Sequence, residues 1–378
     1  MNEQANANEL ANEQMNEQAN EQLNERMNEQ GQNVYAYVGT YTGSGSNGVY
    51  LYQLDTKTGQ FSSTGFCAES KNASFLTIDS QQKYLYAVGE SNEGEVVAFR
   101  IDQATNELTR INSQTSQGRH PCHLSVNREG TFLFAVNYSG GSVCLYPIHE
   151  DGSLKEMSDF IQHEGHGPRA DRQESPHPHS INIDPTNQWI IVPDLGLDTL
   201  FIYRLDADKG KLVEHRQVKL HPAAGPRHLT FHPSAPYVYV INELDSTITA
   251  FSYDASLGQL DTLQTISTLP ENYTGDSTCA DIHITPCGKF LYGSNRGDDS
   301  LAVYRIDSST GLLTLIEIVS TGGQTPRNFS ISPDGKFLLA ANQDSDNIVI
   351  FSIDQSTGRL NNMNLSVDIS KPVCIKFL

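Results

Sequence analysis

The chain carries an internal repeat, and a repeat of this length constrains the fold more than any other feature of the sequence. Each copy contains two short stretches of alternating apolar and polar residues around a turn, as in SFLTIDSQQKYLYAVGE and RNFSISPDGKFLLAANQ. Six copies align without gaps, and they begin at Ser74, Cys122, His179, Arg227, Ala280 and Arg327. Successive copies start 48, 57, 48, 53 and 47 residues apart, and further strand-like stretches such as DSLAVYRID fill the intervals. Four antiparallel strands in each repeat of about 40–50 residues predict a β-propeller, in which each repeat is one blade.

The two ends of the repeat region supply a seventh blade. Residues 33–61 contain the second, third and fourth strands of a copy but no first strand. The C-terminal stretch KPVCIKFL, residues 371–378, is a lone first strand. Pairing these two segments closes the ring and leaves no free sheet edge. We therefore predict an all-β, seven-bladed β-propeller over residues 33–378, closed by pairing of the C-terminal strand with the N-terminal blade.

Residues 1–32 have a different composition from the rest of the chain. They repeat the motif NEQ with a period of four, which drifts around a helix and builds no stable apolar face. Asparagine is a poor helix former, and the segment has little apolar surface to offset the entropy of ordering. We predict a low-complexity, disordered tail that carries no identifiable chemistry.

The charge and cysteine content narrow the partners and the compartment. A formal net charge of -20 argues against nucleic acid as a partner, because phosphate backbones attract basic surfaces. No apolar run approaches the roughly 20 residues that cross a bilayer, and the polar N-terminus does not resemble a signal peptide. The six cysteines have no CxxC spacing, which is typical of reduced thiols. We expect a cytoplasmic protein without a nucleic-acid or membrane partner, and a monomer by default.

The phase of the repeat predicts which distant residues meet. First and second strands are antiparallel, so the start of the first strand and the end of the second lie at the same mouth of the central channel. A structural position should repeat its residue type, as the proline turn column does at positions 185, 233, 286 and 333. The mouth positions vary instead, which is typical of a site placed on a regular fold. Beside the six starting residues, they comprise Phe75, His123, Ser180, His228, Asp281 and Asn328 on the first strands, and Thr40, Glu90, Tyr138, Leu195, Glu243, Arg296 and Gln343 after the second strands.

A neighbouring position is uniform and has a simpler explanation. It holds Gly39, Gly89, Asn137, Asp194, Asn242, Asn295 and Asn342. Asparagine, aspartate and glycine favour tight turns, where their side chains bond nearby backbone groups. A central calcium held by this ring is the weaker alternative, because the carboxylates that calcium prefers are sparse in it.

Several motifs together resemble a known family. SPHPHS, GPRH, INELDST, ADIHITPCGKFLYGSNRG and TPRNFSISPDGKFLLAANQDSDNI occur in this order and look like the lactonase family of seven-bladed propellers. The family includes the bacterial type of 6-phosphogluconolactonase and the fungal carboxy-cis,cis-muconate cyclase, and the resemblance covers about residues 34–378. It implies a lactonase without a metal or other cofactor, acting on a small anionic lactone, 6-phosphogluconolactone of the pentose phosphate pathway. It also implies four site residues, and all of them lie at the mouth positions: His179, Arg227, Glu243 and Arg296.

The residue types suit lactone hydrolysis. An imidazole can carry the proton steps, so we predict that His179 is the general base, with Glu243 orienting it or serving as the general acid. Arginine stays charged, and its planar fork suits a phosphate, a carboxylate or an oxyanion, which assigns such contacts to Arg227 and Arg296. Further candidates for substrate binding lie at neighbouring mouth positions: Arg327, His228 and His123.

Simpler interpretations remain open for some of these residues. Arg227 and Glu243 could form a structural ion pair.

Other motifs near the mouth suggest different chemistry. The stretch HEGH in the loop 160–178 has its histidines three residues apart, whereas the zinc site of a helical zinc protease needs them four apart. This loop is about nine residues longer than its equivalents, so we expect it to cover the site as a lid. Cys122 could be an acyl-enzyme nucleophile, but it has no evident acid partner.

Two other functions compete with the lactonase. One is a cycloisomerase that forms a lactone from a muconate-like acid. The other belongs to a different class, a non-catalytic propeller that serves as a scaffold for protein partners. A scaffold needs no mixed arginine, histidine and glutamate cluster in its channel, so the sequence favours an enzyme.

Overall fold

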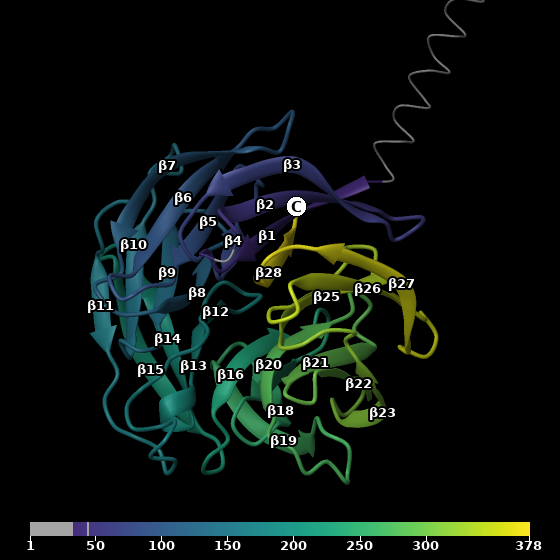
Figure 1. Cartoon of the computed structure of the whole chain (residues 1–378). Coiled ribbons are helices and arrows are strands. Elements are labelled where there is room, and N and C mark those ends of the chain that lie inside the picture. The colour runs from purple at the N-terminus through teal and green to yellow at the C-terminus, as the bar shows by residue number, and fades with distance from the viewer. Residues whose placement is uncertain (1–32, 44) are drawn as a thin grey trace, which may run out of the picture.

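Seven four-stranded antiparallel sheets stand side by side around a central channel in the computed structural model (Figure 1). The structure describes residues 33–43 and 45–378. The prediction for residues 1–32 lies outside this part of the chain. The seven-bladed, all-β architecture is confirmed, and the described part contains one short 3-10 helix, η1 (Leu195–Leu197).

In each sheet the innermost strand faces the channel and the other three follow it outward. The sheet that joins both ends of the described chain consists of β28 (Pro372–Phe377), β1 (Asn33–Thr40), β2 (Gly48–Asp55) and β3 (Phe61–Glu69). The next consists of β4 (Leu76–Ile78), β5 (Tyr84–Gly89), β6 (Glu95–Ile101) and β7 (Leu108–Thr115). The third consists of β8 (Pro121–Val126), β9 (Phe132–Asn137), β10 (Ser142–Pro147) and β11 (Asp159–Gln162). The fourth consists of β12 (Asn182–Ile183), β13 (Ile190–Asp194), β14 (Thr199–Asp206) and β15 (Lys211–Lys219).

The remaining three sheets follow the same order. They are β16 (Pro226–Phe231), β17 (Tyr237–Asn242), β18 (Thr247–Asp254) and β19 (Gln259–Ser267); β20 (Thr278–Ile284), β21 (Phe290–Arg296), β22 (Ser300–Ile306) and β23 (Leu313–Ser320); and β24 (Pro326–Ile331), β25 (Phe337–Asn342), β26 (Asn347–Ile353) and β27 (Leu360–Asp368). First strands of neighbouring sheets contact one another, as β16 does with β20 and β24 with β28. The first strands therefore line the channel.

The ring is closed by the C-terminal strand. β28 pairs antiparallel with β1, with Val38 opposite Ile375 and Ala36 opposite Phe377. In Figure 1 the last strand, in yellow, lies beside the first, in purple. This pairing satisfies the backbone groups of β1 that would otherwise form a free sheet edge. The predicted mode of closure is therefore confirmed.

A repeated contact holds each blade to the next. The hydroxyl of Tyr239 on β17 donates to the carbonyl of Gly311 in the following blade at 2.9 Å, and Tyr292 on β21 does the same to Gly358 at 2.8 Å. Both glycines lie in the turn between the third and fourth strands and have positive φ, 71° and 77°. A Cβ on Gly358 would strike the ring of Phe290 in the preceding blade. The turn motif TGxL therefore uses glycine for both its backbone conformation and its contact with an aromatic ring.

The uniform asparagines are engaged in hydrogen bonds close to their own strands. The Asn137 amide donates to the Ser116 carbonyl at 3.0 Å and to Ser142 Oγ at 2.9 Å. Asn242 makes two bonds of 2.9 Å to threonine hydroxyls on β18. These local bonds of the amide N–H groups agree with the turn role predicted from the sequence.

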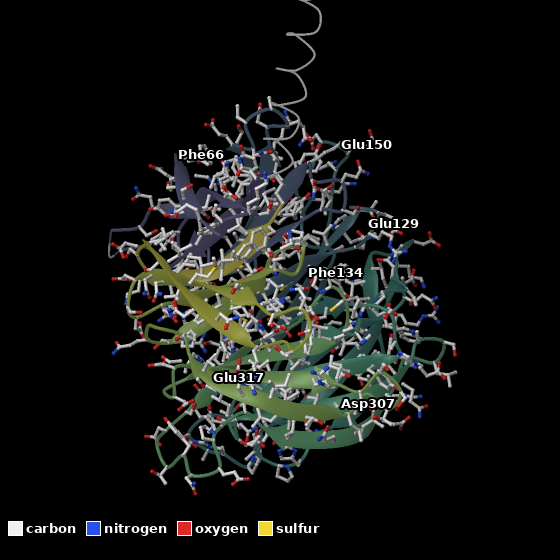
Figure 2. All side chains as sticks on the ribbon, turned by 90° about the vertical axis from the view of Figure 1, so that its right-hand side faces the viewer. Phe66, Glu129, Phe134, Glu150, Asp307 and Glu317 are labelled. Carbon is white, nitrogen blue, oxygen red and sulfur yellow. The ribbon has the colours of Figure 1, made fainter. Side chains whose placement is uncertain are left out.

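Apolar residues of neighbouring sheets pack face to face and form the core between blades. Figure 2 shows the labelled acidic residues Glu129, Glu150 and Asp307 on the outer loops, whereas Phe134 lies inside. Within the described residues, no helix has the length and apolar character that a membrane span needs.

Candidate functional site at the channel mouth

Glu243 is the centre of a buried charge cluster at one mouth of the channel. It follows β17 directly, and its amide donates to the Gly225 carbonyl at 2.7 Å, which fixes the backbone there. Arg227 Nε lies 2.9 Å from Glu243 Oε2, and Arg296 Nη2 lies 2.8 Å from the same oxygen. Arg172 forms an ion pair with Oε1, the other carboxylate oxygen. One carboxylate, 3 % exposed, therefore holds three guanidinium groups.

His179 lies beside this cluster. Its Nε2 is 4.0 Å from Glu243 Oε2, and its ring packs edge-on against Tyr138 with centroids 5.1 Å apart. The sequence predicted that His179 starts an inner strand, but β12 begins only at Asn182. The prediction was wrong at this point: only an isolated bridge between Pro178 and Asp194 precedes β12, and regular pairing starts after His179. The His179 amide still bonds the Pro193 carbonyl at 3.0 Å, which keeps the side chain at the mouth.

Burial and charge set the protonation of this cluster. Burial opposes the charge of Glu243, but Arg296, Arg227 and Arg172 outweigh it and hold the pKa of Glu243 well below its usual range. Burial, together with Arg296 and Arg327, lowers the pKa of Arg227 to about 10. Burial, followed by Arg227 and His228, lowers the pKa of His179 well below the ordinary imidazole value. At neutral pH the site therefore holds an ionised Glu243 and an uncharged His179.

Arg327 lines the same mouth and is engaged differently. Its guanidinium carbon lies 5.6 Å from the centroid of the Tyr41 ring, and the Tyr41 hydroxyl donates to Glu90 Oε2 at 2.8 Å. Among the described residues, no carboxylate oxygen lies within 4.0 Å of the Arg327 guanidinium. Arg327 is half-buried on β24, so its positive charge faces the mouth without a bound counter-ion.

The two other predicted binding residues lie deeper in the channel. His228 Nδ1 is 2.8 Å from Asp281 Oδ1, and Arg227 Nη1 approaches His228 Nε2 at 3.2 Å. Burial, followed by Arg227, lowers the pKa of His228 to about 4. His123 stacks on Phe75 with ring centroids 3.9 Å apart. His228 thus supports Arg227, and His123 and Phe75 form part of a partition across the channel.

The long loop 160–178 contacts the charge cluster through Arg172, a residue that was not among those predicted from the sequence. The loop is anchored at several points. His163 contacts Asp194 Oδ2 at 2.6 Å and the Tyr203 hydroxyl at 2.8 Å, while His177 stacks on Tyr138. His163 is buried and His166 is exposed, so the two histidines of HEGH do not face a common site. The extra length of the loop was the only signal in the sequence for this contribution.

The cavity at the mouth is small. It measures about 10 Å³, roughly the room of one water molecule, and its lining includes His179, Arg227, Arg327 and Cys122. Cys122 Sγ lies 3.7 Å from His179 Nδ1, and burial raises the pKa of its thiol, which disfavours the thiolate that a nucleophile requires. Within residues 33–43 and 45–378, no three or more His, Cys, Asp or Glu side chains gather as potential metal ligands.

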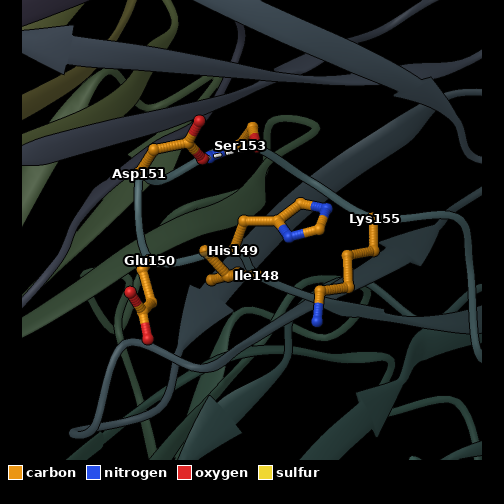
Figure 3. Close-up of a pocket in the computed structure, with 6 residues that line it drawn as sticks. All are labelled: Ile148, His149, Glu150, Asp151, Ser153 and Lys155. Carbon is orange, nitrogen blue, oxygen red and sulfur yellow. Dashed lines mark hydrogen bonds between the residues drawn. The ribbon is translucent and has the colours of Figure 1, made fainter.

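A larger hollow of about 570 Å³ lies away from the channel, where the chain passes from β10 to β11 (Figure 3). Its lining comes from residues 148–155 of this single connection. Asp151 accepts hydrogen bonds from the Ser153 amide at 3.0 Å and from Ser153 Oγ at 2.6 Å, so its carboxylate serves the turn. The hollow shares no residue with the charge cluster, and the small channel mouth is the stronger candidate site.

Comparisons with known proteins agree with the architecture. A family profile described as "Lactonase, 7-bladed beta-propeller" matches residues 35–377. The 6-phosphogluconolactonase of Bacillus subtilis (strain 168) is 38% identical over 343 residues, which cover 90% of this chain and 97% of that protein. A Lactococcus lactis protein described as uncharacterized, YwcC, is 36% identical over 286 residues, 76% of this chain and 82% of its own. The solved structure of the periplasmic gluconolactonase PpgL of Pseudomonas aeruginosa is 31% identical, with a TM-score of 0.88 over 92% of this chain and 99% of that one.

Proposed function

This chain belongs to the lactonase family of seven-bladed β-propellers, and we propose that it hydrolyses an anionic sugar lactone, 6-phosphogluconolactone, to 6-phosphogluconate. This reaction is a step of the pentose phosphate pathway. The observation that carries the proposal is the composition of the mouth. An uncharged, buried imidazole lies beside fixed guanidinium groups, and one further arginine there has no carboxylate partner.

His179 is the proposed proton carrier. Its imidazole takes a proton from a water molecule as the water oxygen forms a bond to the lactone carbonyl carbon. The bond between that carbon and the ring oxygen then breaks, and the proton returns from His179 to the ring oxygen. Water and lactone together give the hydroxy acid, so the step requires no oxidant, reductant or metal ion to balance.

Glu243 is assigned an orienting role instead of a general-acid role. A carboxylate whose pKa is held well below its usual range has no proton to donate at neutral pH. It does fix the guanidinium groups of Arg227 and Arg296, each through a contact shorter than 3.0 Å. Arg296 Nε is buried and has no hydrogen-bond partner among the described residues, so an N–H donor is available for the developing oxyanion.

Arg327 is the proposed anchor for the anionic group of the substrate. Arg227 and Arg296 are already paired with Glu243, whereas Arg327 has no such partner. An arginine fork binds a phosphate through two parallel charge-assisted hydrogen bonds. Arg327 and His179 line the same mouth, so the phosphate would bind Arg327 while the reacting carbonyl lies near the imidazole.

Substrate entry requires a rearrangement. A six-membered sugar lactone is far larger than a cavity of about 10 Å³. The loop 160–178 contacts Glu243 through the half-exposed Arg172, which makes this loop the part of the mouth best placed to move. Opening would exchange the contact between Arg172 and Glu243 for contacts with substrate, as lids do in other enzymes.

The test is hydrolysis of freshly generated 6-phosphogluconolactone above the spontaneous rate. We expect His179→Gln to lower kcat/KM by about 100- to 10,000-fold, the usual contribution of a general base. His166→Gln, at an exposed histidine of the loop 160–178, is the matched control and should retain activity. Absence of acceleration by the unaltered protein would remove the proposed substrate, and loss of activity with a chelator would remove the metal-free step.

A second assay tests whether Arg327 binds the phosphate group of the substrate. Arg327→Gln should raise KM for 6-phosphogluconolactone by about 10- to 100-fold, because a charge-assisted contact is lost. The same variant should change KM for unphosphorylated gluconolactone little. An equal effect on both lactones would show that Arg327 does not bind the phosphate.

A further inference from the structure

The innermost strands carry a second set of equivalent residues. Each lies three positions after the residue that starts its copy of the repeat, as Thr230 does after Arg227. Register confirms the equivalence, because Thr230, His283 and Lys376 face Tyr239, Tyr292 and Tyr37 of their second strands. The set contributes one residue from each blade, and every member is polar. It comprises Thr77, Ser125, Asn182, Thr230, His283, Ser330 and Lys376, here named the polar ring.

Six members of the polar ring line one cavity of about 180 Å³, and Ser330 is the exception. Phe75 and His228 line both this cavity and the catalytic mouth, so they separate the two along the channel. The volume suits a small ligand of several heavy atoms, whereas the mouth in this structure has room for about one water molecule.

Lys376 gives this cavity a positive charge. Its ammonium lies 4.5 Å from the centroid of the Phe75 ring, and no carboxylate oxygen of the described residues lies within 4.0 Å of it. The one acidic residue in the lining, Asp281, is already engaged by His228 at 2.8 Å and His283 at 3.0 Å. The ammonium is therefore the cationic group of the lining that no carboxylate of the described residues engages, and a ligand oxyanion can bind to it.

The remaining members offer hydrogen bonds. The hydroxyls of Thr77 and Thr230 have no partner among the described residues. Ser125 donates to the Ile181 carbonyl at 2.5 Å, which leaves its oxygen free to accept. A ring of hydroxyl groups around one cation matches a ligand that combines an anionic group with hydroxyl groups.

We propose that the polar ring is a binding site for a small oxyanion, held by Lys376 through its phosphate or carboxylate oxygens. Inorganic phosphate and the carboxylate of a sugar acid share this chemistry. A sugar acid would also place its hydroxyl groups against Thr77, Ser125 and Thr230. The site is distinct from the proposed catalytic mouth, and it does not depend on the proposed function.

The experiment is calorimetric titration of the full chain with inorganic phosphate and, separately, with gluconate. Lys376→Met should weaken binding of whichever anion occupies the ring by roughly 10- to 100-fold, the loss expected for a charged hydrogen bond. Lys289→Met is the matched control, because it removes an identical charge from an exposed turn outside the lining and should leave affinity unchanged. Binding of gluconate but not phosphate would identify a sugar acid as the occupant, and the reverse would identify a free phosphate.

Location is checked by diffraction from crystals soaked in selenate, whose selenium gives an anomalous signal. A peak within hydrogen-bond distance of Lys376 Nζ, absent from Lys376→Met, supports the site. Peaks confined to the Arg327 mouth, or equal affinities of Lys376→Met and the unaltered protein, overturn it. If Lys376→Met fails to fold, Thr230→Val keeps the charge and the shape and should still weaken gluconate binding. Lactonase assays of the same variants report on the catalytic proposal separately.

Discussion

The turn glycines and the mouth residues are both equivalent positions of the same repeat, yet they behave in opposite ways. Gly311 and Gly358 recur in successive blades with the same φ sign and the same tyrosine hydrogen bond from the preceding blade. At the mouth, the equivalent positions of neighbouring blades hold His179, Arg227 and Ala280. Each blade must pack on the next in the same way around the ring, so the residues that make this contact recur. A binding or catalytic site instead needs different side chains that converge on one point. Repetition within this fold therefore marks the positions that hold the blades together, and its loss marks the candidate site.

The strongest test of this contrast is Glu243→Gln. We expect it to lower the free energy of unfolding by about 3–5 kcal/mol, because it leaves guanidinium groups buried without their carboxylate. It should also lower kcat/KM by about 100- to 1,000-fold through loss of arginine positioning. Urea unfolding and lactonase assays measure the two effects.

The matched control is Glu95→Gln, which removes an exposed ion pair with Arg110 at 3.4 Å. It should cost less than about 1 kcal/mol and leave activity intact. A Glu243→Gln variant that is as stable and as active as the control would mean that the buried cluster is dispensable.

A repeated position should affect stability alone. Gly358→Ala combines an unfavourable positive φ with a collision against Phe290, and we expect a loss of about 2–4 kcal/mol. Gly130→Ala has a similar φ of 69° but nothing within 4 Å of the added Cβ, so the backbone strain of about 1–2 kcal/mol acts alone. Thermal unfolding gives the difference. A change in kcat/KM for folded Gly358→Ala would contradict the separation of structure from chemistry.

The smallest expected effect is a shift in pH dependence. As the proposed base, His179 would act only when uncharged, so we expect activity to fall as pH drops through its pKa. Because burial and neighbouring positive charges lower that pKa, the acid limb of kcat/KM should lie below the ordinary imidazole value of about 6.5. Arg327→Gln removes one of those charges and should move the limb to higher pH. A limb at or above pH 6.5 in the unaltered protein would argue against His179 as the base.

Much of the site was accessible from the sequence because the repeat fixes phase. Arg227 and Glu243 lie 16 residues apart, but one starts a first strand and the other follows a second strand, so antiparallel pairing brings them together. The same arithmetic places Arg296 from the next blade beside them. The ion pair between Arg227 and Glu243 was also predicted as a structural alternative, and the observed contact is compatible with both this role and the proposed one.

Phase could not predict what lies outside the repeat. Arg172 belongs to an inserted loop with no equivalent in other blades, so comparing equivalent positions of the repeat could not identify it. The low pKa of His179 depends on burial and on the distances to several positive groups, which a sequence pattern does not supply. The difference between paired Arg296 and unpaired Arg327 also arises from side-chain conformation, because both residues occupy varied positions at the same mouth.

The pairing of β28 with β1 has a consequence for how the protein is made. During translation β1 is synthesised long before its partner, because the chain from Thr40 to Pro372 separates the two strands. At about 5–20 residues per second, the delay is on the order of tens of seconds. Throughout that time β1 exposes an edge that a strand of another nascent chain could occupy. Synthesis order thus leaves the N-terminal blade open to exchange between molecules until Pro372–Phe377 are synthesised, and until then the cavity lacks the wall that Lys376 provides.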